Sequence, residues 1–125
     1  MKTRLVVAIC LLAVCLATAL FCVWQLEARA KALQEGLEFA LETALLDEPS
    51  AEITEEVLRI WRKSRPFLHI LLPHMSLNEL EWALGSLPEF QRQGERMLYI
   101  EHCVRAIQCV KTVREMERLN WSNVF

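Results

Sequence analysis

A run of 20 residues without a charged side chain, from Leu5 to Trp24, constrains this sequence more than any other feature. At a rise of about 1.5 Å per residue, such a run forms a helix about 30 Å long, which matches the hydrocarbon thickness of a bilayer. Trp24 closes the run where an indole ring favours the headgroup layer, and Lys2 and Arg4 precede it. We therefore predict a membrane anchor over residues 1–24, with the spanning helix at 5–24.

A cleaved signal peptide is the alternative to this anchor. The apolar core of a signal peptide is usually about 7–15 residues long, which is shorter than this run. Ala28-Arg29-Ala30 has small residues at the spacing of a cleavage site, but Arg29 is unfavourable there. We therefore prefer an uncleaved, single-pass anchor. The early basic residues and the short N-terminal end favour a cytoplasmic N-terminus, which places the rest of the chain outside the cytoplasm.

The apolar residues after the run recur at helical spacing. The first stripe advances in steps of four and three residues and continues directly from the membrane span: it consists of Leu26, Ala30, Leu33, Leu37, Ala40 and Ala44. Pro49 cannot continue this helix, and Ser50 is a suitable N-cap for the next one. The sequence therefore predicts that the membrane helix and the first helix of the following domain are one element.

Three further helices are predicted by the same spacing. The second begins after Ser50, and Pro66 should kink or break it. The third buries Leu77, Leu80, Leu84 and Leu87 and ends near Pro88, with a turn at Gly94. The fourth buries Met97, Ile100, Val104, Ile107 and Val110, and Arg114 lies in its last turns. We expect an all-α protein in which the transmembrane helix continues into a small antiparallel bundle of about four helices over 25–119, followed by a tail at 120–125.

Charge is segregated along the chain. The chain has 16 acidic and 14 basic residues, a balance that does not favour a nucleic-acid binder. Residues 25–56 hold nine acids and two bases, whereas 57–74 hold four bases and no acid. These four bases, Arg59, Arg62, Lys63 and Arg65, form a candidate surface for anionic lipid or nucleic acid. The preferred alternative is a solvated face or pairing with the acidic first helix, and an external domain leaves no nucleic-acid partner.

The sequence contains no recognisable catalytic set. Three scattered glycines cannot build a phosphate loop, and no HExxH motif is present. The candidate metal ligands His74, His102, Cys103 and Cys109 lack a compact ligand spacing. We therefore predict no enzyme activity, no cofactor, no metal and no small-molecule substrate. A membrane-anchored ligand or metal sensor that uses these His and Cys residues is the alternative.

Cys103 and Cys109 lie six residues apart, which is about 9 Å of rise on one helix. A disulfide needs Cα atoms within about 7 Å, so these two residues should not pair on an intact helix. Cys103 falls on the apolar stripe and is predicted to be core. Cys109 is then a candidate for an intermolecular disulfide if the domain lies outside the cytoplasm.

Two interaction surfaces are predicted. Leu26, Leu33 and Leu37 are candidates for a seam through which two copies associate. Trp82 does not fall on the stripe of its helix, so it is either a docking residue or packs against another helix. With the bilayer and a protein partner as its contacts, the chain is predicted to be a non-enzymatic interaction or structural module at the cell envelope.

The chain resembles an uncharacterised family of small bacterial proteins that is frequent in clostridia-like Gram-positives. The resemblance covers nearly the whole chain and rests on Trp61 with the apolar run after it, on His74-Met-Ser-Leu-Asn-Glu-Leu-Glu81, and on Leu119-Asn-Trp-Ser-Asn-Val-Phe125. Members have one N-terminal membrane helix followed by a helical domain. The resemblance implies the same topology and a bacterial plasma membrane, and it supplies no active site.

Overall fold

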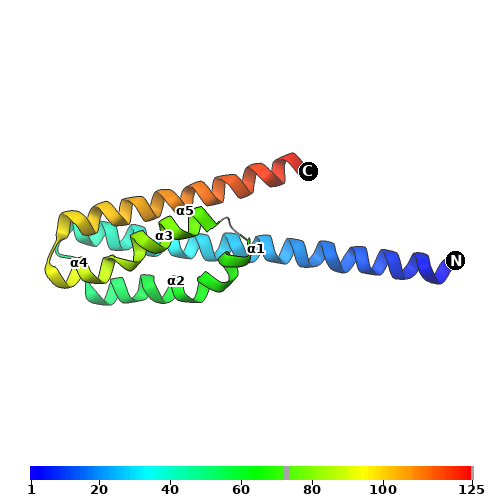
Figure 1. The fold of residues 1–125 in the computed structure, drawn as a ribbon, viewed down its shortest axis with the longest axis horizontal. Coiled ribbons are helices and arrows are strands. Elements are labelled where there is room, and N and C mark those ends of the chain that lie inside the picture. The colour runs from blue at the N-terminus through cyan, green and yellow to red at the C-terminus, as the bar shows by residue number, and fades with distance from the viewer. Residues whose placement is uncertain (72–73, 125) are drawn as a thin grey trace.

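The computed structural model describes the backbone of residues 1–71 and 74–124, and the side chains of residues 1–69 and 77–116. The described chain is helical, with no strand (Figure 1). Five helices follow one another: α1 (Lys2–Leu46), α2 (Ala51–Leu71), α3 (His74–Gly85), α4 (Leu87–Gln93) and α5 (Arg96–Val124). The all-α prediction is confirmed. The predicted number of about four helices agrees with the structure, in which the third predicted helix is divided at Ser86 into α3 and the short α4.

The helix α1 is one continuous element of 45 residues. Its C-terminal half packs into the helical domain, while its N-terminal half projects from that domain by itself (Figure 1). The predicted stripe is confirmed residue by residue, since the buried residues of α1 are Leu26, Ala30, Leu33, Leu37, Ala40 and Ala44. The apolar spacing therefore located the buried face of this helix correctly.

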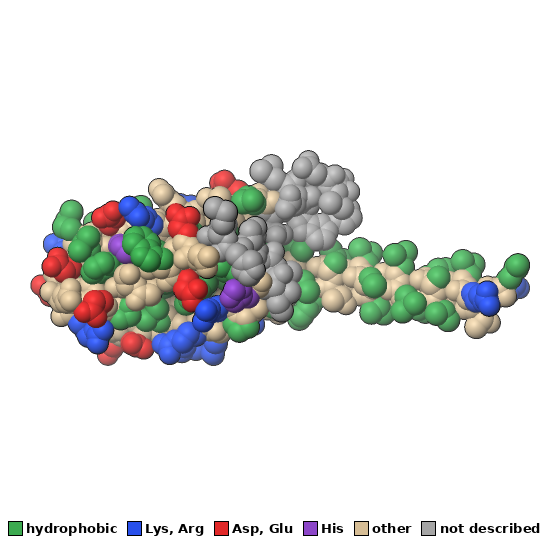
Figure 2. Space-filling view, in the orientation of Figure 1, with side chains coloured by type: hydrophobic (Ala, Val, Ile, Leu, Met, Phe, Trp, Pro, Cys, Tyr) green, Lys and Arg blue, Asp and Glu red, His purple; other side chains and the backbone are tan. Residues whose placement is uncertain are grey.

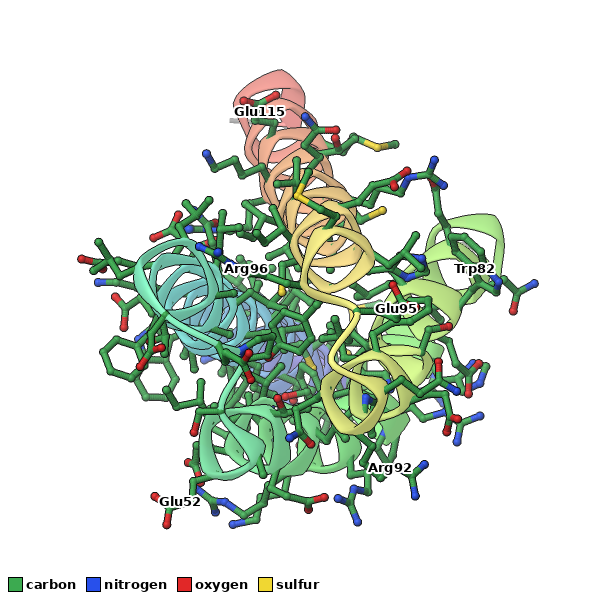
Figure 3. The ribbon with its side chains drawn as sticks, turned by 90° about the vertical axis from the view of Figure 1, so that its left-hand side faces the viewer. Glu52, Trp82, Arg92, Glu95, Arg96 and Glu115 are labelled. Carbon is green, nitrogen blue, oxygen red and sulfur yellow. The ribbon has the colours of Figure 1, made fainter. Side chains whose placement is uncertain are left out.

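The helices α2 and α5 run back along α1. At one end the Arg96 guanidinium of α5 donates hydrogen bonds to the carbonyls of Ala44 and Leu45, at 2.6 and 2.5 Å. Towards the other end Arg114 of α5 pairs with Glu27 of α1. The α3 and α4 helices complete the packing around the core (Figure 3).

Contacts between α1 and α2 fix their register. The Arg29 guanidinium donates to the Lys63 carbonyl at 3.3 Å, and Gly36 lies beside Val57 and Ile60. Residue numbers on the two helices therefore run in opposite directions, and the C-terminal end of α2 lies nearest the projecting part of α1.

Local chemistry explains several helix boundaries. The Ser50 hydroxyl accepts a long hydrogen bond of 3.4 Å from the Ile53 amide, as expected for the N-cap of α2. Gly94 ends α4 at φ 71°, a left-handed conformation that disfavours side chains. Pro66 does not break α2, which continues to Leu71, although the last turns of α2 bend out of line (Figure 1). Of the two predicted effects, a kink or a break, the break is excluded and the bend agrees with a kink.

The predicted face of α5 requires a correction. Met97 and Val104 are exposed, whereas Ile107 and Val110 of the predicted stripe are buried, as is Cys103, which was also predicted to be core. Tyr99, which was not predicted to be core, is fully buried. The buried face is therefore rotated away from Met97 and towards Tyr99. The helix α5 continues to Val124, so it includes most of the residues that were assigned to the tail at 120–125. Arg114 consequently does not lie at a helix end, and it pairs with Glu27 instead.

One buried polar pair ties α2 to α5. The Thr54 hydroxyl lies 2.7 Å from the Tyr99 hydroxyl and donates to the Ser50 carbonyl at 2.7 Å. Both residues are almost completely shielded from solvent. Burial raises the pKa of Tyr99 to about 12. This pair fixes the relative position of the two helices at the end of the core far from the projecting part of α1.

Candidate functional site

The projecting half of α1 is the most unusual surface of the molecule. It contains a window of mean hydropathy 3.0, none of which is buried within the protein, so α1 is long and apolar enough to cross a membrane. Figure 2 shows apolar side chains along this projection, with basic residues at its tip. A helix that is apolar on every side and packs against nothing in its own chain requires an apolar environment.

The hydroxyl group between Leu5 and Trp24 has a partner within the helix. It belongs to Thr18, which donates to the Val14 carbonyl at 2.8 Å and needs no water. At the far end the rings of Phe21 and Trp24 lie 6.3 Å apart, centroid to centroid. Leu26 is already buried in the bundle, so only Gln25 separates the apolar segment from the core.

The predicted seam for self-association requires a correction. Leu26, Leu33 and Leu37 are between 0% and 3% exposed, because they form the centre of the protein's own core. In this fold they are not available to a second copy. The stripe itself was located correctly, but other helices of the same chain cover it.

The basic residues of α2 lie on a solvated face. Arg59 pairs with Glu56 and Arg62 with Glu55 at 3.6 Å, both within α2, and Arg65 pairs with Glu81 of α3 at 2.7 Å. The Arg59 guanidinium lowers the pKa of the Glu56 carboxyl by hydrogen bonding. The predicted pairing between the acidic first helix and this basic segment is therefore wrong, since its described ion pairs lie within α2 or reach α3.

Lys63 differs from its neighbours. Its side chain is exposed, and no ion pair in the described part of the chain includes it. Its backbone carbonyl accepts the hydrogen bond from Arg29 that holds α1 against α2. The ammonium group of Lys63 is therefore displayed on a rigid part of the bundle.

Trp82 is exposed and also packs against α5, so each of its two predicted alternatives holds in part. Its side chain is 55% exposed and points outwards from α3 (Figure 3). One face of its indole lies against the His102 ring, with centroids 4.7 Å apart, and the Arg105 guanidinium lies 5.6 Å from the ring. Phe90 covers His102 from another side at 4.8 Å. The indole is therefore held in place while much of its surface remains free.

A second apolar surface was missed by the sequence analysis. Phe39, Leu45, Leu46 and Met97 are between 55% and 81% exposed, at the end of the bundle far from the projecting segment. Arg96 joins the two helices that carry them by capping the C-terminal end of α1. The only sequence signal was that Leu45 and Leu46 lie outside the apolar stripe.

The candidate metal ligands do not converge. Among the side chains that the structure describes, no group of three or more His, Cys, Asp or Glu residues could hold a metal ion, and the side chain of His74 lies outside those residues. His102 is buried, and its Nδ1 atom lies 3.3 Å from the Ala83 carbonyl oxygen. Cys103 is enclosed in the core, and its burial raises the pKa of the thiol to about 12.

The predicted intermolecular thiol lies in a shallow surface hollow. Cys109 is half-buried in a hollow of about 220 Å³ that Glu79, Arg105, Gln108 and Thr112 also line. Burial raises the pKa of this thiol, and the nearby Glu79 carboxylate raises it further. Because the thiolate is the reactive form, this environment slows the oxidation that an intermolecular disulfide requires.

No protein-family model matches the chain, and no curated protein or solved structure gives a match. The geometry of the residues themselves is therefore the basis for assigning a function.

Proposed function

We propose that this protein is a non-enzymatic, single-pass membrane protein whose antiparallel helical bundle binds a protein partner at the cell envelope. The proposal includes a bacterial plasma membrane, a cytoplasmic N-terminus and an extracytoplasmic bundle. The observation that carries it is the uncharged segment 5–24, none of which is buried, and which continues without interruption into the core helix of the bundle. The resemblance to small clostridial membrane proteins is part of the same proposal.

The energetics of insertion support an anchor. Segment 5–24 contains eleven Leu, Ile, Val and Phe residues, and each contributes about −0.3 to −0.6 kcal/mol to insertion at the membrane centre. Their sum is about −5 kcal/mol, which favours insertion but is small enough for a few charged residues to cancel. One arginine at the centre of the segment costs about 3 kcal/mol, so two arginines should reverse the balance.

This balance defines the first experiment. The full-length chain carrying Leu12→Arg and Leu16→Arg should be released from membranes by alkaline extraction, whereas the wild type should stay in the pellet. The matched control carries Ala32→Arg and Glu38→Arg, two exposed positions on the packed half of the same helix, and should also stay in the pellet. Wild-type protein that is itself extracted would refute the anchor.

The orientation requires a separate measurement. A reporter that is active only outside the cytoplasm, fused after Phe125, should be active, and a cytoplasmic reporter at the same position should be silent. The reverse pattern would place the bundle in the cytoplasm and refute this part of the proposal.

Two exposed apolar surfaces support a protein partner. Trp82 presents a positioned indole on the side of the bundle, and aromatic residues of this kind often dominate binding energy at interfaces. Met97 and Leu46 are exposed apolar residues at the end of the bundle that α1 holds away from the membrane. A photoreactive residue in place of Trp82 or Met97 should form an adduct in native membranes, whereas one in place of the exposed Gln108 should not. Adduct formation at none of these positions would remove the support for a partner.

A further inference from the structure

The fold sorts charge along the long axis of the bundle in a way that the linear sequence does not show. Height along α1 gives a common scale, because α1 runs straight from the apolar segment into the bundle (Figure 1). On this scale Arg29 lies level with Lys63, Glu27 lies near Arg114, and the far end is marked by the contact between Arg96 and Ala44.

The half of the bundle next to the apolar segment is basic. It comprises residues 25–36, 59–71, 74–82 and 104–116, which contain nine basic and five acidic residues, a formal charge of +4. The far half comprises residues 37–58 and 83–103, which contain two basic and ten acidic residues, a formal charge of −8. The bundle is therefore a charge dipole whose positive end faces the predicted membrane surface.

The three lysines of the bundle lie at nearly one height on this axis. They are Lys31 of α1, Lys63 of α2 and Lys111 of α5, which we call the lysine belt. Lys63 is level with Arg29, and Lys111 precedes by one turn the Arg114 side chain that contacts Glu27 and Gln34. All three side chains are exposed, and none takes part in an ion pair with another described residue.

The height of the belt matches the position of lipid headgroups. Lys31 lies seven residues beyond Trp24, which is about 11 Å along the helix. A headgroup layer is about 5–8 Å thick on each side of the hydrocarbon core, and a lysine side chain can extend its ammonium towards that layer. Because α1 is continuous, it holds the belt at a constant distance from the bilayer. The membrane surface is therefore the anionic surface that the belt meets in every copy of the protein.

We propose that the lysine belt binds anionic phospholipid headgroups and holds the bundle upright on the membrane. The inference rests on the proposed membrane anchor and adds the class of lipid that the bundle recognises. Lysine suits this role because its compact charge attracts phosphate without the fixed two-point geometry of arginine. The acidic far half is repelled by the same surface, so both ends of the dipole favour one orientation.

The test uses the full-length chain in lipid nanodiscs of phosphatidylcholine alone, or of equal parts phosphatidylcholine and phosphatidylglycerol. Each basic residue near an anionic surface should lower the equilibrium constant for urea unfolding of the bundle about fivefold. The wild type should therefore unfold at higher urea in the anionic discs, and the difference should vanish at about 1 M salt, where the Debye length is about 3 Å.

Two variants make the test specific. Lys31→Gln, Lys63→Gln and Lys111→Gln together should unfold like the wild type in neutral discs and lose the stabilisation by phosphatidylglycerol. The control carries Glu42→Gln, Glu48→Gln and Glu52→Gln, which also remove three charges, but negative ones in the far half. It should keep the stabilisation by phosphatidylglycerol.

Three results would overturn the proposal in distinguishable ways. A chain that leaves the discs would refute the anchor and the lipid contact together. A chain that stays in the discs but unfolds equally in both lipids would refute the lipid contact alone. Equal stabilisation by inorganic phosphate in neutral discs would show that the belt binds free anions and not lipid.

Discussion

The buried hydroxyl pair between α2 and α5 leads to a prediction about which partner donates. Thr54 lies 2.7 Å from both the Ser50 carbonyl and the Tyr99 hydroxyl. A threonine hydroxyl has one proton and a carbonyl can only accept, so Thr54 donates to Ser50. The Tyr99 hydroxyl must then donate to Thr54.

Because Tyr99 donates and Thr54 accepts, substitutions of these two residues should destabilise the protein by different amounts. Tyr99→Phe removes the donor and leaves Thr54 with its bond to Ser50, so it should cost about 1 kcal/mol. Thr54→Val leaves the tyrosine proton without an acceptor in a fully buried site, and the cost should rise to about 2–3 kcal/mol. The double variant should cost less than the sum of the two, because it leaves no buried donor unpaired.

Urea unfolding of the full-length protein in detergent micelles, followed by far-ultraviolet circular dichroism, measures these differences. Thr43→Val is the matched control, because the Thr43 hydroxyl makes a similar bond to the Phe39 carbonyl at an exposed site. It should change the free energy of unfolding by no more than about 0.5 kcal/mol. The reasoning would be refuted if Tyr99→Phe were as destabilising as Thr54→Val.

Three further predictions use the same preparation. Gly94→Ala should lower the free energy of unfolding by about 1 kcal/mol, because Gly94 has a φ of 71°. Gly85→Ala should raise it by about 0.5 kcal/mol, because Gly85 is helical and has free space around it. Urea unfolding that gave the opposite signs would contradict the backbone argument. Tyr99 is the single tyrosine, so its ultraviolet titration should have a midpoint near 12 in the folded state. Stability should be fully present below about pH 10 and fall between about pH 10 and 12, because the folded state retains a proton that the unfolded chain loses; a midpoint near 10 would show that the ring is solvated. A thiol reagent at about pH 8 should modify Cys109 slowly and Cys103 only after unfolding; equal rates for the two thiols would contradict the described burial.

The sequence predicted buried faces and helix ends correctly wherever a single strong local signal determined them. The stripe from Leu26 to Ala44 was located without error, because apolar residues on α1 recur with few competing candidates on other faces. Ser50 and Gly94 were identified because capping and left-handed backbone each restrict the residue types that fit.

The prediction failed where tertiary packing decided the outcome. On α5 two neighbouring stripes are both apolar, and hydropathy ranked Met97 above Tyr99 although Tyr99 is the buried residue. Burial of a tyrosine depends on a hydrogen-bond partner, and here Thr54 supplies it from 45 positions away. The enclosed His102 likewise depends on contacts with Trp82 and Phe90 that no local spacing encodes.

The helix α1 continues without a break from its projecting half into its packed half, and this continuity has a mechanical consequence. A rigid helix whose apolar part is about 30 Å long must tilt by about 26° to fit a hydrocarbon layer of about 27 Å. Because Leu46 lies 22 residues beyond Trp24, or about 33 Å, the same tilt would carry the far end of the bundle sideways by about 14 Å. The helix would then act as a lever that converts a change of a few ångströms in bilayer thickness into a much larger lateral displacement of the bundle.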